Sequence, residues 1–120
     1  MSQELSNNYG KISISREVIA IVAGLAAMEC YGLVGMSSQK LQDGLAELLG
    51  MENLSKGVEV RIENDEVIID FYIIVEYGVN ITEVANNVID RVNYSVEKMT
   101  GVKPSKININ VQGVRIGATY

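Results

Sequence analysis

Apolar residues recur every three or four positions in two long stretches of the chain, which is the period of an amphipathic helix. The first stretch, residues 18–28, contains no charged residue. Its apolar side chains share one helical face at Val18, Ile21, Val22, Leu25 and Met28, and an adjacent face at Ile19, Ala23 and Ala26. A helix that is apolar most of the way round is buried or pairs with a partner. We therefore expect this helix to serve in packing or assembly.

The ends of this first helix are also predicted. Ser15 has the side chain of an N-cap, and Glu17 suits the positive end of the helix dipole. Gly32 and Gly35 are expected to end the helix and to shape an irregular connection. A short amphipathic helix should follow, beginning at Ser37 or Ser38 and closed by Gly50. Its apolar stripe consists of Leu41, Leu45, Leu48 and Leu49.

The second long stretch predicts a helix over residues 80–100. Asn80 and Glu83 have the spacing of a capping box at its start. Gly101 is placed to end it, and Pro104 prevents its continuation. The apolar stripe of this helix consists of Ile81, Val84, Ala85, Val88, Ile89, Val92, Val96 and Met99.

Residues 58–63 alternate cleanly between apolar and polar, and residues 67–77 form the longest predicted strand, whose second face is mixed; together they predict a hairpin. Asn64-Asp65 forms its turn, because both residue types tolerate positive φ. The apolar pairs that fix its register are Ile62 with Val67, Val60 with Ile69, and Val58 with Phe71.

Two further strands are predicted at the ends of the chain. Residues 11–14 alternate, with Ile12 and Ile14 expected to face inward. Residues 106–113 alternate apolar side chains with uncharged polar ones.

These elements predict one α+β domain with the order β-α-α-β-β-α-β. We expect a single small mixed or antiparallel sheet with helices packed on one face. A split βαβ, ferredoxin-like order is the first interpretation, and a smaller mixed sheet with the N-terminal strand at its edge is the alternative. The domain should span residues 10–116, between a flexible N-terminal tail at 1–9 and a C-terminal tail at 117–120.

Composition and charge exclude several classes of function. The chain has 120 residues and a net charge of −5, and its ten Lys and Arg residues are scattered. It therefore lacks the basic patch of a nucleic-acid binder, and its acidity disfavours binding to anionic lipid headgroups. The N-terminus does not resemble a signal peptide, and the longest apolar run is about half of the roughly 20 residues that a membrane span needs. We expect a cytoplasmic protein with no nucleic-acid partner and no direct membrane insertion.

The residues offer no catalytic or metal-binding set. The chain contains no His, so its single cysteine, Cys30, lacks the usual activating base and is interpreted as a buried small hydrophobe. Residues 32–35 match the spacing of an RNA-clamping loop but lack nearby basic residues, so a simple turn is the better interpretation. Glu59 and Asp70 should face each other across the hairpin as a solvated pair beside Arg61. We expect no enzyme activity, no cofactor and no metal.

Five segments of the chain resemble the alkaline shock protein family of Gram-positive bacteria, also called the envelope stress response family. These segments are residues 10–19 (GKISISREVI), 26–36 (AAMECYGLVGM), 54–58 (LSKGV), 73–78 (IIVEYG) and 111–114 (VQGV). The chain is most similar to the short, housekeeping branch of the family. The resemblance implies a cytoplasmic, non-enzymatic protein with no family active site.

The resemblance also implies the kind of partner. Some members self-associate and lie beneath the membrane by binding a small membrane-anchor protein, and others are linked to control of fatty-acid and phospholipid metabolism. We therefore expect a homo-oligomer that acts in cell-envelope stress response and homeostasis, peripheral to the membrane through a partner protein. The alternative is a regulatory binding partner of a soluble enzyme of lipid metabolism.

A candidate interaction surface lies on the second face of the longest predicted strand. Ile68, Tyr72 and Ile74 alternate there with Asp70 and Glu76. If helices cover only the other face, these three apolar side chains would form an exposed patch of the kind that marks a contact site. The polar rim of this surface would come from the last strand, at Asn108, Asn110 and Gln112. The alternative is that the first helix, or the segment after it, folds over this face.

Overall fold

The computed structural model describes residues 2–7, 9–30, 32–36 and 57–116. The elements in chain order are β1 (Ser2–Asn7), β2 (Gly10–Ser15), α1 (Arg16–Met28), β3 (Leu33–Met36), β4 (Val58–Glu63), β5 (Glu66–Glu76), α3 (Ile81–Thr100) and β6 (Lys106–Arg115). The short helix predicted around Leu41 to Leu49 and the tail predicted at 117–120 lie outside the described residues.

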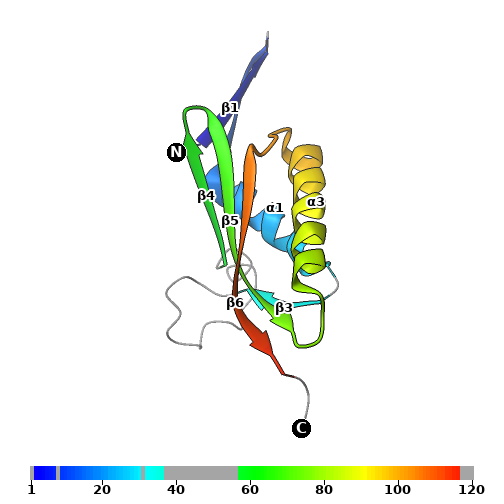
Figure 1. Ribbon diagram of the computed structural model, residues 1–120. Coiled ribbons are helices and arrows are strands. Elements are labelled where there is room, and N and C mark those ends of the chain that lie inside the picture. The colour runs from blue at the N-terminus through cyan, green and yellow to red at the C-terminus, as the bar shows by residue number, and fades with distance from the viewer. Residues whose placement is uncertain (1, 8, 31, 37–56, 117–120) are drawn as a thin grey trace.

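β5 is the central strand of a four-stranded mixed sheet (Figure 1). It pairs in parallel with β6 from Ile68 to Glu76, which occupies nearly the whole of one edge. β4 and β3 therefore share the opposite edge, both antiparallel to β5. The parallel β5–α3–β6 unit is a βαβ unit, as the predicted order of the last strand, helix and strand allows.

The β4–β5 hairpin confirms the predicted register pair by pair, with Val58 opposite Phe71, Val60 opposite Ile69 and Ile62 opposite Val67. Asn64 and Asp65 form the turn with φ of 52° and 68°. Asn and Asp reach these left-handed angles more readily than other non-glycine residues, so the turn fixes the register together with the apolar face.

The helix ends also agree with the sequence. The Ser15 side chain accepts a hydrogen bond from Val18 N at 3.3 Å, and the Asn80 side chain accepts one from Glu83 N at 3.0 Å. Gly101 ends α3 in the left-handed conformation, with φ of 79°. Each cap satisfies backbone groups that the helix itself leaves unpaired.

The core lies between the sheet and the two helices, which cover the same face (Figure 1). α3 contributes a stripe of four valines, and β5 contributes alternate residues along its whole length. The buried apolar side chains are Ile19, Ala20, Ala23, Ala26, Ala27, Leu33, Val58, Val60, Val67, Ile69, Phe71, Ile73, Val75, Val84, Val88, Val92, Val96 and Val102.

α1 turns mainly small residues toward the core, and Ile19 is its one large side chain that is fully buried. Ala20, Ala23 and Ala27 are buried, whereas Val18 and Leu25 are each 46% exposed. Small side chains let the helix backbone approach α3 and β4 closely. Val18, Leu25 and Met28 on the predicted apolar face are exposed, whereas Val22 on the same face packs against the core. The expectation of an all-round buried helix is therefore only partly met.

The N-terminal residues differ from the expected flexible tail. β1 pairs antiparallel with β2 from Ser2–Ser15 to Asn7–Gly10, and this two-stranded sheet is separate from the main one. Ile14 packs against the core, but Ile12 is 53% exposed. Ile12 does not face inward as predicted, because β2 projects from the body of the molecule instead of joining the main sheet (Figure 1).

The segment after α1 is also more regular than predicted. β3 pairs with β5 through Leu33, Gly35 and Met36, with a bulge between Leu33 and Gly35. The expected irregular connection at Gly32 and Gly35 is therefore a short bulged strand. Alternation is too short to detect in four residues that include a glycine.

The α+β class with helices on one face is confirmed, but the strand order differs from the ferredoxin-like first interpretation. That order would place the strand before α1 inside the main sheet, whereas β2 pairs only with β1 among the described residues. β3 occupies the place beside β5 instead.

Candidate interaction surface

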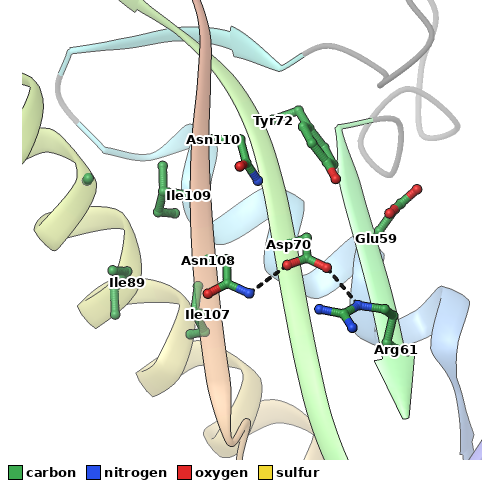
Figure 2. A pocket seen from close by; sticks show the side chains of 10 residues that line it. Glu59, Arg61, Asp70, Tyr72, Ile89, Ile107, Asn108, Ile109 and Asn110 are labelled. Carbon is green, nitrogen blue, oxygen red and sulfur yellow. Dashed lines mark hydrogen bonds and ion pairs between the residues drawn. The ribbon is translucent and has the colours of Figure 1, made fainter. Parts of the chain in front are cut away.

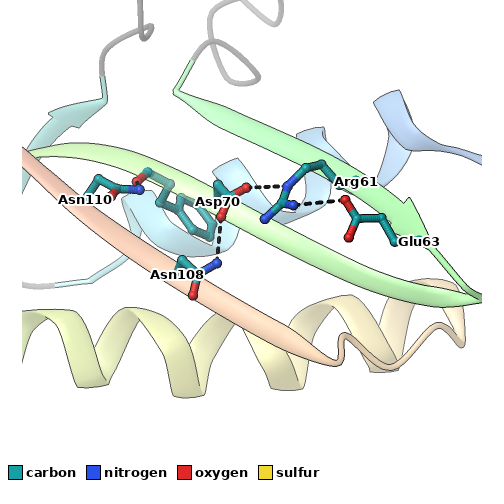
Figure 3. Close-up of polar contacts among 6 residues, drawn as sticks. Arg61, Glu63, Asp70, Asn108 and Asn110 are labelled. Carbon is teal, nitrogen blue, oxygen red and sulfur yellow. Dashed lines mark hydrogen bonds and ion pairs between the residues drawn. The ribbon is translucent and has the colours of Figure 1, made fainter.

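The face of the sheet opposite the helices carries a hydrogen-bonded cluster centred on Asp70 (Figure 2). Asp70 Oδ2 accepts from Arg61 Nε at 2.9 Å, and Asp70 Oδ1 accepts from Asn108 Nδ2 at 2.7 Å. These residues come from β5, β4 and β6, so the cluster ties all three strands together on this face. Arg61 also donates from Nη1 to Glu63 Oε2 at 3.0 Å (Figure 3).

Asp70 is buried, with 7% of its surface exposed. Burial alone raises the pKa of this carboxyl group, but the hydrogen bonds from Arg61 and Asn108 and the positive charge of Arg61 outweigh it. The net result is a lowered pKa. Asp70 is therefore held as a carboxylate, and the same interactions raise the pKa of Arg61.

This geometry corrects the interpretation of Glu59 and Asp70 as a solvated pair. The two residues are opposite each other in the hairpin, as predicted. Glu59 is exposed, but Asp70 lies in the centre of the sheet with Arg61 and Asn108 as partners. The only sequence feature pointing to this role is an acidic residue within the apolar run of residues 67–75.

The apolar members of the predicted surface lie on this face, but they are half-buried rather than fully exposed. Ile68, Tyr72 and Ile74 have β6 on one side. On the other side β4 pairs with Ile68 and β3 pairs with Ile74, whereas Tyr72 lies between the ends of these two strands. Burial is the main cause that raises the pKa of the Tyr72 hydroxyl, and the negative charges of Glu59 and Asp70 add to it. Tyr72 therefore stays neutral beside the Asp70 cluster.

The three predicted rim residues of β6 have different environments. Asn108 Nδ2 donates a hydrogen bond to Asp70, and Asn110 Nδ2 donates one to the backbone oxygen of Phe71 at 3.1 Å. Gln112 is exposed where the pairing of β6 with β5 shifts, between Val111 and Gly113. Asn108 and Asn110 thus secure β6 to β5, which the alternation in the sequence did not reveal.

The titratable groups of this surface are held in fixed protonation states. Its carboxylate is paired and ionised, and its hydroxyl is neutral. Among the described residues, no group of three or more Cys, Asp or Glu side chains is arranged to hold a metal ion.

Cys30 lies at the end of α1, away from this surface. Its thiol is half-buried and donates weakly to the backbone oxygen of Ala26 at 3.9 Å. Burial is the largest influence on its pKa and raises it, although Arg91 acts in the opposite direction. Arg91 itself pairs with Glu29 across α1 and α3. The thiol is therefore not activated.

Known proteins are similar in sequence to nearly the whole length of this chain. The alkaline shock protein (ASP23) family, described as having a cell envelope-related function, matches residues 4–116. The chain is 54% identical over 117 residues to the uncharacterized protein YloU of Bacillus subtilis, covering 97% of this chain and 98% of that protein. It is 36% identical over 106 residues to the uncharacterized protein YqhY of the same species, covering 88% and 78%.

The name of a more distant relative states a role. A stress response regulator gls24 homolog of Streptococcus pyogenes is 24% identical over 106 residues, covering 88% of this chain and 59% of that protein. No solved structure matches the chain. No helix in the described part of the chain is long and apolar enough to cross a membrane. The chain belongs to the alkaline shock protein family, as its sequence segments indicated.

Proposed function

We propose that this member of the alkaline shock protein family is a non-enzymatic protein of cell-envelope stress response and homeostasis. It acts by self-association and by binding a protein partner near the membrane. The family match over residues 4–116 supports the envelope role, and the name of the Streptococcus pyogenes relative supports a regulatory role.

The observation that carries this proposal is the face of the sheet that α1 and α3 leave uncovered. Ile68, Tyr72 and Ile74 present apolar surface there, around a carboxylate whose position is fixed by Arg61 and Asn108. A central apolar patch with an ordered polar surround is the composition of a protein–protein contact. We therefore place the contact of this protein with its partners on that face.

The test is the variant Tyr72→Glu, which puts a charge at the centre of the face. We expect weaker self-association or partner binding by size-exclusion chromatography with light scattering, while circular dichroism stays unchanged. Tyr94→Glu is the matched control, because Tyr94 is 62% exposed on α3 and lies away from this face. If Tyr72→Glu keeps the wild-type assembly, or simply unfolds, the contact is not on this face.

Affinity purification separates the proposal from its alternative. Recovery of the protein with copies of itself and with membrane proteins supports the assembly role. Recovery with a soluble enzyme of fatty-acid or phospholipid metabolism instead supports a regulatory subunit.

A further inference from the structure

β6 is an edge strand whose outer side has no pairing strand among the described residues. It is ten residues long, contains no proline, and carries charges only at its two ends, Lys106 and Arg115. Natural proteins usually protect such edges with internal charges, prolines or shortened strands. The one irregularity of β6 lies near its C-terminal end, so most of its edge is open to backbone pairing.

A shallow groove of about 770 Å³ extends from Glu59 and Arg61 on β4, past Asp70 and Tyr72, and around this edge to α3. Ile107 and Ile109 of β6 and Ala85 and Ile89 of α3 line its apolar side, and all four are half-buried. Figure 2 shows Ile89 facing Ile107 and Ile109 across this side, with Asn108 and Asn110 on the other side of the strand. A strand laid along β6 would therefore place alternate side chains against the apolar wall and against the amides.

Asn93 lies beside the groove on α3, although it is not among the residues that line it. It continues the row of Ala85 and Ile89 on α3, because residues four apart share a helix face. Its buried Oδ1 has no hydrogen-bond partner. A buried acceptor without a partner is costly, and a donor from an added segment would satisfy it.

The charges around the strand indicate which segment fits. From Lys98 to the end of the sequence the chain has four basic residues and no acidic one, although its net charge is −5. Lys106 and Arg115 are exposed at opposite ends of β6, and neither forms a salt bridge in the described part of the structure. Acidic side chains at the ends of an added strand would pair with them.

A second copy of β6 fits less well than a foreign segment. Two copies aligned antiparallel over their full length would place Lys106 opposite Arg115 at both ends. Like charges directly opposite each other destabilise a strand pair.

We propose that the groove between β6 and α3 binds an extended segment of a partner protein by strand addition. The segment has apolar residues at alternate positions and acidic residues at its ends. Pairing of an extended peptide with a free sheet edge is an established mode of recognition, in which the backbone gives affinity and alternate pockets give specificity. This inference rests on the proposed function for the class of partner, a protein. Its groove adjoins the Tyr72 face, since Tyr72 and Asp70 also line it, but the proposed contacts lie at the β6 edge and on α3.

The test uses a fluorescent peptide of alternating valine and threonine with aspartate at both ends. We expect saturable binding to the full-length protein by fluorescence anisotropy, with NMR shift changes concentrated at Ala85, Ile89, Ile107 and Ile109. A peptide with proline at its centre cannot continue the ladder and should bind at least about tenfold more weakly. A peptide with lysine at both ends should also bind more weakly.

Two sets of variants locate the site. Ala85→Trp fills the groove and should weaken binding at least about tenfold, whereas Asn87→Trp, on another side of the same helix, should not. The double variant Lys106→Glu with Arg115→Glu leaves the apolar wall intact. It should reverse the preference, so that the lysine-ended peptide becomes the tighter binder.

Absence of binding at about 1 mM peptide would overturn the proposal, since that is the weakest affinity of interest. The proposal would also be overturned if the central proline did not lower the affinity of the peptide, or if the charge reversal did not change which peptide binds more tightly. A third result would also overturn it: the wild-type protein does not bind the peptide but forms a dimer that Ala85→Trp dissociates. The groove would then bind a second copy of the chain. None of these results depends on Tyr72→Glu, so failure here is distinguishable from failure of the proposed function.

Discussion

Asp70 is a buried carboxylate that depends on two neighbours for its charge. Removal of the Arg61 guanidinium would leave that charge with Asn108 alone. We expect Arg61→Leu to lower the free energy of unfolding by about 1–3 kcal/mol, the cost of an unsatisfied buried polar group. Urea denaturation measures this. Glu63→Ala is the control: it removes only the exposed partner of Arg61 and should change stability by less than about 0.5 kcal/mol.

The lowered pKa of Asp70 also predicts a pH dependence. A carboxyl group whose folded pKa lies below its unfolded value contributes stability that is fully present above the unfolded pKa, about 3.9 for Asp. That contribution is lost as the pH falls from there through the folded pKa. The melting temperature of the wild type should therefore fall on acidification through this window, and the melting temperature of Asp70→Asn should fall less. Identical pH profiles would contradict the role assigned to Asp70.

Cys30 is expected to be structural. Its pKa is raised by burial, so little thiolate is present at neutral pH. Cys30→Ala should alter stability by about 1 kcal/mol or less and leave partner binding intact, as measured by chemical denaturation and light scattering. Fast alkylation of the folded protein at neutral pH, with loss of assembly, would show that the thiol has a functional role.

At the scale of single residues, the sequence predicted which face of the sheet a side chain lies on better than it predicted the hydrogen-bond partner of that side chain. Alternation places Ile68, Asp70 and Tyr72 on one face correctly, since the period of a strand is a local property. The bond between Asp70 and Asn108 joins residues 38 apart in the chain and exists only because β6 lies beside β5. Such a contact follows from strand order, which local patterns do not determine.

Among the elements, the position of β3 depends on the glycine directly before its first residue. Gly32 has φ of +91°, and a Cβ there would lie 2.8 Å from Val84 Cγ2 on α3. Gly32→Ala should therefore combine backbone strain with a steric clash and destabilise the protein by more than about 1 kcal/mol. Gly78→Ala is the matched control, because Gly78 has φ of +98° but open space around its Cα.

Both glycine variants should therefore be strained, and only Gly32→Ala should also disturb packing. Chemical denaturation of the two proteins isolates the packing cost as the difference between them. Equal losses of stability would show that Val84 yields to the added methyl group without cost.

Elements with strong local patterns were predictable, and those without them were not. The β4–β5 hairpin combines clean alternation with a turn that fixes its register, so its pairs follow from the sequence. β1 has a mostly polar sequence and β3 has only four residues, so neither shows a usable period. For α1 the pattern showed two apolar faces, and the choice of the alanine-rich one depends on close approach to α3 and β4.

For the whole molecule, the net charge predicts that the protein does not bind lipid membranes directly. The net charge of −5 opposes adsorption to anionic lipids, and the described residues offer no spanning helix. The four basic residues from Lys98 to Arg115 only reach the lower limit of the clusters of about four to eight that bind anionic membranes, and Lys106 and Arg115 lie at opposite ends of β6 rather than together. Purified protein should therefore stay in the supernatant when sedimented with either anionic or neutral vesicles.

The same experiment separates direct from indirect membrane contact. Lowering the ionic strength should not cause binding, because repulsion between the protein and anionic lipid grows as screening decreases. Reversing Lys106 and Arg115 to Glu should likewise leave the result unchanged, although we expect it to alter peptide binding. Substantial sedimentation of the protein with anionic vesicles alone would show that the molecule contacts lipid itself, and would remove the need for a partner at the membrane.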